Sequence, residues 1–200
     1  MEWTSIAKDS LTVAFTFAGL EIARQGLETW KKQIQGIKVF EVAYDLRYSV
    51  LKLRDAIKHV RNPAIWPSEN NRAVKYFREK HPDTAESDTQ KEEDPQPYVY
   101  EMRWEEITNA FTEVESYLLG AEVLWGTEIL TLMKPLKTKI VELNIALSQR
   151  FQPKEFQTKT AMELHGIIYD QGNENGDDPF SKEVALSIKN ITDYIKQKTS

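Results

Sequence analysis

Apolar residues recur at intervals of three or four along the stretch from Tyr98 to Phe151. This spacing places them on one face of an α-helix, so it predicts one long helix, or a helix broken once, over residues 98–151, whose apolar stripe must be covered by other helices. Pro135 removes a backbone donor and Gly120 and Gly126 loosen the helix, so we expect a kink between Gly126 and Pro135. The stripe consists of Phe111, Val114, Leu118, Ala121, Trp125, Ile129, Leu132, Leu136, Ile140, Leu143 and Leu147.

A second pattern of this kind predicts a helix over residues 37–61. Its apolar positions alternate in steps of three and four, which is typical of a coiled-coil seam, and further apolar residues widen the face toward a bundle interior. Asn62 and Pro63 end the helix, because the residue before a proline avoids helical angles. The seam consists of Val39, Val42, Leu46, Ser49, Leu53, Ala56 and Val60, and Tyr44, Val50, Leu51 and Ile57 widen it.

The other segments are shorter. Residues 62–97 are expected to form a loop that holds a short helix, capped by Ser68, and an acidic tract. Further helices are predicted over 154–169 and over 179–198, where Asp178 caps and Pro179 takes the first helical position. No window shows the sustained alternation of a strand. The chain is therefore predicted to be one all-α domain, an elongated antiparallel helical bundle with long coiled-coil-like helices.

The most apolar window, residues 10–23, belongs to a predicted N-terminal helix over 1–34. Only eleven uncharged residues lie between Asp9 and Glu21, about half of what a membrane span requires, so a simple transmembrane helix is not expected. Two interpretations remain: a buried central helix of the bundle, or a helix that inserts into the membrane surface. On the second, the anchor would be Leu11, Val13, Phe15, Phe17 and Leu20, with Lys31, Lys32 and Lys38 as lipid headgroup contacts.

The distribution of charge along the chain adds information on which helices pair. The net charge is −5, which argues against a nucleic-acid binder, and the absence of cysteine excludes disulfides and thiolate chemistry. Residues 24–80 carry thirteen Lys and Arg against six acids, a balance of +7, whereas residues 98–130 carry seven Glu against one Arg, a balance of −6. The two helical arms are thus electrically complementary, as expected of an antiparallel hairpin.

Specific residues refine that expectation. Arg47, Arg54 and Arg61 recur every seven residues and form one basic line, for which the glutamates of the long helix are the nearest partners. Those glutamates are Glu101, Glu105, Glu115 and Glu122. The trio Tyr100, Arg103 and Trp104 would anchor a helix end rather than form a stacking surface.

No metal or cofactor is expected. The three histidines His59, His81 and His165 are far apart, and no Gly-rich phosphate loop or nucleophile elbow is present. The loop at residues 171–182 resembles a calcium-binding loop, but Gln171 and Lys182 occupy the positions that should be carboxylates.

The segment from Arg54 to His59 resembles the Arg-polar-x-x-x-His motif of the HEPN superfamily of α-helical ribonucleases. That resemblance implies metal-independent cleavage of RNA across a dimer, with Arg54 stabilising the phosphate and His59 acting as general acid or base. The alternative is that both residues lie on the solvated or ion-paired flank of the seam.

A looser set of motifs resembles uncharacterised bacterial proteins in which an apolar, membrane-associated N-terminal helix precedes a cytoplasmic helical hairpin. The matching residues are Trp30, Gln33, Gly36, Tyr44, Arg61-Asn62-Pro63, Tyr100, Arg103 and Trp104. The resemblance implies a bacterial origin and supplies no reaction. This chain departs from those proteins in carrying charged residues within its N-terminal helix, at Lys8, Asp9 and Glu21.

Together these observations predict a non-catalytic helical interaction or scaffold protein of bacterial type. It would be cytoplasmic, with peripheral attachment to the inner face of the inner membrane as an open alternative, and it would bind a protein partner or self-associate. Two alternatives are a HEPN-like ribonuclease of a defence or toxin system and a phage or mobile-element protein that binds a host factor. Nucleic acid is an expected partner only in the ribonuclease case.

Overall fold

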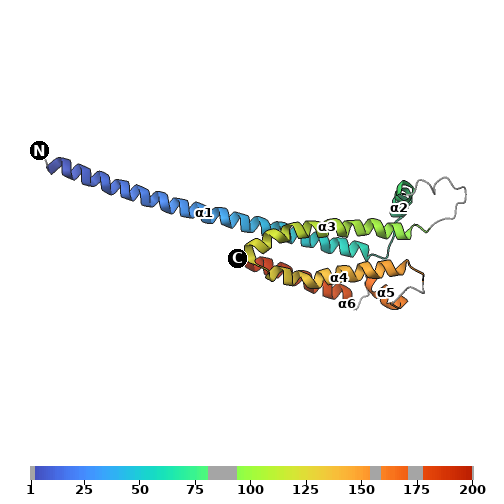
Figure 1. Ribbon diagram of the computed structural model, residues 1–200. Helices are drawn as coiled ribbons and strands as arrows, with labels where there is room; N and C mark the ends of the chain where they lie inside the picture. Colours follow the sequence, from blue (N-terminus) through green and yellow to red (C-terminus); the bar gives the residue numbers. More distant parts are fainter. Residues whose placement is uncertain (1–2, 81–93, 154–158, 171–177, 200) are drawn as a thin grey trace. The chain divides into compact units, whose positions relative to one another are not determined.

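The described part of the chain folds into helices and contains no strand, which confirms the all-α prediction (Figure 1). The computed structural model describes residues 3–80, 94–153, 159–170 and 178–199, with side chains from residue 19 onward except Lys80. Its helices are α1 (Trp3–Val60), α2 (Pro67–Lys80), α3 (Gln96–Trp125), α4 (Glu128–Arg150), α5 (Ala161–Ile168) and α6 (Pro179–Lys198).

The chain divides into two units, residues 1–41 and 42–200. Helix α1 continues through Gly36 without a break, so the predicted separation into helices over 1–34 and 37–61 was wrong. An isolated glycine weakens a helix by about 1 kcal/mol relative to alanine but does not end it when its neighbours favour helix, as Gln33, Gln35 and Lys38 do. In the first unit, the described side chains from residue 19 to 41 are exposed, except for half-buried Val39.

In the second unit, α1 and α3 form an antiparallel pair. Gly120 lies against Val42, Lys52 Nζ is 2.7 Å from a Glu113 carboxylate oxygen, and His59 contacts Glu106. The partner number falls as the α1 number rises, which defines the antiparallel register. The predicted heptad seam is buried from Leu46 to Val60, but Tyr44, expected to widen it, is exposed.

The predicted long helix over 98–151 is two helices, α3 and α4, joined at Gly126. Gly126 has φ +82° and ψ −173°, a conformation that glycine alone adopts readily, so the chain reverses there. The ion pair between Lys137 and Glu115, at 3.0 Å, shows that α4 returns along α3. Pro135 lies inside α4. Proline has no N–H, so the Thr131 carbonyl lacks its usual helical donor. Both residues are exposed, so water can hydrogen-bond to that carbonyl.

Helices α4, α5 and α6 complete the core. The α6 stripe Val184, Ile188, Ile191 and Ile195 is buried as predicted, and Asp178 caps α6 by accepting a hydrogen bond from the Ser181 N–H. Helix α5 begins at Ala161, where Thr160 and Glu163 form a reciprocal capping box, and the predicted start near residue 154 lies outside the described residues.

Candidate functional site

Arg103 is the most heavily hydrogen-bonded side chain of α3, and only 2 % of its surface is exposed. Its guanidinium donates to the Asn62 and Ala64 carbonyls, both at 2.7 Å, which follow the end of α1. It also donates to both carboxylate oxygens of Glu69, at 2.9 and 3.0 Å. Arg103 therefore joins α1, α2 and α3, and the expectation that it anchors a helix end is confirmed.

A polar cleft of about 280 Å³ adjoins this anchor. It contains His59, whose Nδ1 lies 2.8 Å from a Glu106 oxygen and whose Nε2 lies 3.5 Å from Glu69. The hydrogen bonds from Arg103 hold the pKa of Glu69 at about 2, against an ordinary value of 4.5. Tyr76 donates to Glu105 at 2.9 Å on the same side. The cleft thus places an imidazole between two carboxylates, one of which is ionised at any physiological pH.

Arg61 forms a second buried anchor at the end of α1. It donates to the Ile167 and Tyr169 carbonyls, both at 2.8 Å, and to the Asp178 carboxylate at 2.9 Å. It also donates to the Ser181 hydroxyl. Arg61 therefore ties α1 to α5 and to the start of α6.

The predicted pairing of the basic line with the α3 glutamates was wrong for the described residues. Arg61 turns toward Asp178, and Arg54 bonds its own neighbour Asp55 at 2.8 Å. Arg47 is exposed. The basic line lies along a different side of α1 from the one that faces α3, where Lys52 and His59 make the contacts instead.

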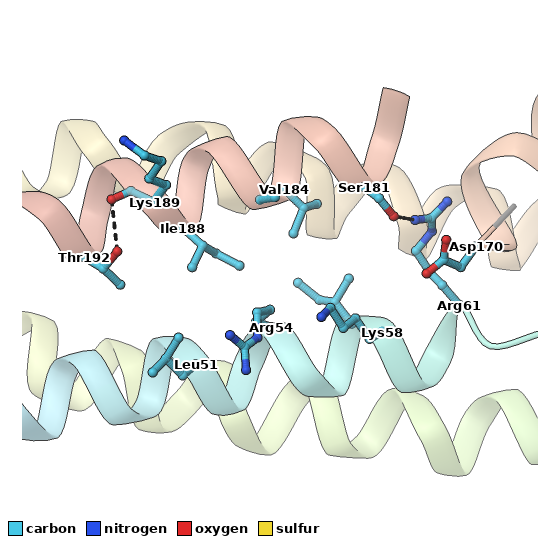
Figure 2. Close-up of a pocket in the computed structure, with 12 residues that line it drawn as sticks. Leu51, Arg54, Lys58, Arg61, Asp170, Ser181, Val184, Ile188, Lys189 and Thr192 are labelled. Carbon is cyan, nitrogen blue, oxygen red and sulfur yellow. Dashed lines mark hydrogen bonds between the residues drawn. The ribbon is translucent and has the colours of Figure 1, made fainter. Parts of the chain in front are cut away.

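A groove of about 400 Å³ separates α1 from α6 in the second unit, and Figure 2 shows the residues that line it. Leu51 and Ile57 of α1 and Val184 and Ile188 of α6 form its apolar walls. Cations are among the residues that line it: Arg54 and Lys58 on α1, with Arg61 at one end, and Lys189 on α6, whose amine Figure 2 shows directed away from α1. Sequence reasoning missed this groove, because nothing in the chain reveals which face of α6 approaches α1.

The two residues of the HEPN-like motif line different cavities. Arg54 borders the groove between α1 and α6, whereas His59 borders the polar cleft beside α2 and α3. Positions five apart on a helix point about 140° away from each other, which accounts for the separation. Because the resemblance implies that the two residues meet across two subunits, their roles stay a prediction.

In the first unit, α1 carries an exposed apolar stripe that we call the α1 stripe: Leu20, Ala23, Leu27, Trp30, Ile34 and Ile37. Its large members are 40 to 63 % exposed. Lys31, Lys32 and Lys38, predicted as headgroup contacts, are exposed beside it. Among the predicted anchor residues only Leu20 has a described side chain; those of Leu11, Val13, Phe15 and Phe17 lie outside the described residues.

Among the described residues, no helix combines the length and apolar character that crossing a bilayer demands, and no cluster of three or more His, Cys, Asp or Glu is arranged to hold a metal ion. No family model matches the chain, and neither curated proteins nor solved structures provide a significant match.

Glu69 is the functional-site residue that sequence reasoning overlooked. Ser68 was predicted to cap α2, but the helix begins one residue earlier and Glu69 accepts from the Trp66 N–H at 2.9 Å. A glutamate three residues after the residue that precedes the helix, here Trp66, was the available signal.

Proposed function

We propose that this chain is a non-catalytic helical interaction protein that self-associates through the α1 stripe as a parallel coiled coil. The observation that supports the proposal is the stripe itself. Six apolar positions, Leu20, Ala23, Leu27, Trp30, Ile34 and Ile37, follow the 3-4 spacing of heptad positions a and d, and all are exposed. An apolar face of this length on a helix is typical of an association surface.

Charge beside the stripe supports one orientation and one partner. Arg24, Lys31 and Lys38 occupy successive e positions, while the g positions Gly19, Gly26 and Gln33 carry no charge. In a parallel pair each e residue faces a g residue of the other copy, so no like charges meet. In an antiparallel pair the e residues would face one another and the cations would repel. A parallel second copy is therefore the occupant that this pattern favours.

The test is the molar mass of the full chain in solution, measured by light scattering after size exclusion. We expect a dimer, and a monomer for Ile34→Glu, because a carboxylate in the seam would be desolvated. Gln35→Glu is the matched control, since it adds the same charge one residue away, at position b outside the seam, and should leave the dimer intact. A monomeric native chain, or equal effects of both substitutions, would refute self-association through the stripe.

Peripheral membrane attachment at the inner face of the inner membrane is the competing use of the same surface. If the stripe binds lipid, the protein should float with vesicles of neutral and anionic lipid in a density gradient. Replacing Lys31, Lys32 and Lys38 with glutamine should then lower the fraction of protein that floats. Flotation of a protein that remains monomeric in solution would place lipid, not a second copy, on the stripe. A dimer that does not float supports the coiled coil.

A HEPN-like ribonuclease is the second candidate. The contact between His59 and Glu106 favours it, because a carboxylate that orients an imidazole is a common arrangement for acid-base catalysis. If the proposal holds, the purified chain degrades RNA without added metal, His59→Ala abolishes the activity, and His165→Ala, in an exposed histidine of α5, leaves it unchanged. RNA that stays intact with the native chain removes this candidate.

A further inference from the structure

The groove between α1 and α6 has the features of a ligand site that the proposed interaction function does not use. Its lining residues all belong to the second unit, and none of them is part of the α1 stripe. Its volume of about 400 Å³ lies within the range typical of small-molecule sites. It runs from Leu51 to Arg61 along α1, a length of roughly 15 Å at 1.5 Å per residue.

The walls of the groove are apolar on both sides. Leu51 and Ile57 lie on α1, and Val184 and Ile188 lie on α6, with Figure 2 showing Leu51, Val184 and Ile188 directed into the space between the helices. Ala185 adds a small side chain to the α6 wall and leaves room there. An apolar chain placed along these residues would be removed from water, which favours binding.

The charges of the groove are strongly biased. Four cations and one carboxylate, Asp170, line it. Arg61, Arg54 and Lys189 are each paired with an aspartate, so Lys58 is the cation that sets the local field. Arg54 is bonded to Asp55 and Lys189 to Asp193, while Lys58 forms no hydrogen bond or ion pair with the described residues. Because Arg54 and Lys58 are one helical turn apart, they stand on the same face of α1.

Apolar walls beside these cations select for a ligand with an apolar body and an anionic head. A cationic amphiphile would be repelled, and an uncharged chain would lower the hydration of Lys58 and Arg54 without compensating for it. A carboxylate matches the fork of a guanidinium and the point charge of a lysine. We propose that the groove between α1 and α6 binds a single-chain amphiphilic carboxylate, with its chain between α1 and α6 and its head group at Lys58 and Arg54.

The probe is decanoate, titrated into the isotopically labelled full chain and followed by amide chemical shifts. We expect shifts at Val184, Ala185 and Ile57, and binding at least ten-fold weaker for decanol, which has the same chain and no charge. Decyltrimethylammonium should not bind in the groove. If decanol binds as tightly as decanoate, or if the amide shifts are confined to residues 20–37, the proposal is overturned.

Three variants localise the site. Lys58→Glu should weaken decanoate binding at least ten-fold, and Lys134→Glu, which reverses an exposed lysine of α4, should not change it. Ala185→Trp fills the groove from an exposed position and should also abolish binding while circular dichroism and the unfolding midpoint stay near those of the native chain. Ile34→Glu, in the α1 stripe, should leave decanoate binding unchanged, so this test is independent of the coiled-coil proposal. Binding that survives both Lys58→Glu and Ala185→Trp refutes the groove as the site.

Discussion

Arg103 and Glu69, which are 34 residues apart in the chain, form a buried two-pronged ion pair in which guanidinium Nε and Nη2 each donate to a different carboxylate oxygen. The guanidinium also donates to two carbonyls beyond the end of α1, so four of its five N–H groups are bonded. A charge pair removed from water contributes to stability only when its partners are well hydrogen-bonded, as this arginine is. This pair therefore holds three helices together.

Replacing Arg103 with alanine should lower the free energy of unfolding by about 3 kcal/mol or more, because it leaves Glu69 charged and buried without its partner. Urea denaturation would measure the loss. Lys52→Ala is the control: it removes an ion pair with Glu113 in which the lysine is 54 % exposed, and such pairs contribute about 0 to 1 kcal/mol. Similar losses for both variants would contradict a special role for Arg103.

The same pair predicts an acid-sensitive stability. The pKa of Glu69 is about 2 in the folded chain against 4.5 ordinarily, so the ionised carboxylate stabilises the fold above pH 4.5, and the contribution fades as the pH falls toward 2. The difference is worth roughly 3 kcal/mol at neutral pH. The unfolding free energy of Glu69→Gln should therefore lie well below that of the native chain at pH 6 and approach it only as the pH falls to about 2. A gap that stays constant with pH would argue against this pKa.

Asp178 should contribute more to the stability of the fold than a helix cap alone does. It accepts from the Ser181 N–H and also pairs with buried Arg61, so Asp178→Ala removes a cap and leaves a buried cation unpaired. We expect a loss of about 3 kcal/mol or more in thermal or urea unfolding. Thr160→Ala removes an exposed cap alone and should cost about 1 kcal/mol. Equal losses would show that the contact with Arg61 contributes nothing.

Replacing either of two glycines in the hairpin between α3 and α4 with alanine should change the stability of the fold, in opposite directions for the two positions. Gly126 has φ +82°, so Gly126→Ala should destabilise the fold by about 1–3 kcal/mol. Gly120 is helical, and an added Cβ would meet Val42 at 3.5 Å, an ordinary contact, so Gly120→Ala should stabilise by about 0.5–1 kcal/mol. We expect the unfolding midpoint of Gly126→Ala to fall below the native value and that of Gly120→Ala to rise above it. A shift of both midpoints in the same direction would contradict this prediction.

The sequence alone determined the helices and most of their buried faces. A repeat of three and four residues fixes which side chains share a face, and that was sufficient for the stripes of α3, α4 and α6. Local chemistry also placed the Asp178 cap and the region of the Gly126 turn, because both depend on a few neighbouring residues. It misjudged Gly36, where a helix boundary depended on small differences in free energy, and the predicted helix start near residue 154 lies outside the described residues.

Only the tertiary structure decided which charged residues meet. The heptad spacing placed Arg47, Arg54 and Arg61 on one line but could not say which neighbouring helix that line faces. Arg61 met Asp178, 117 residues away, and not a glutamate of α3. The groove between α1 and α6 arose in the same way, from two helices that are distant in the chain. Periodicity fixes a direction around one helix axis, whereas pairing and cavities depend on how separate axes pack, and that is set by the whole core.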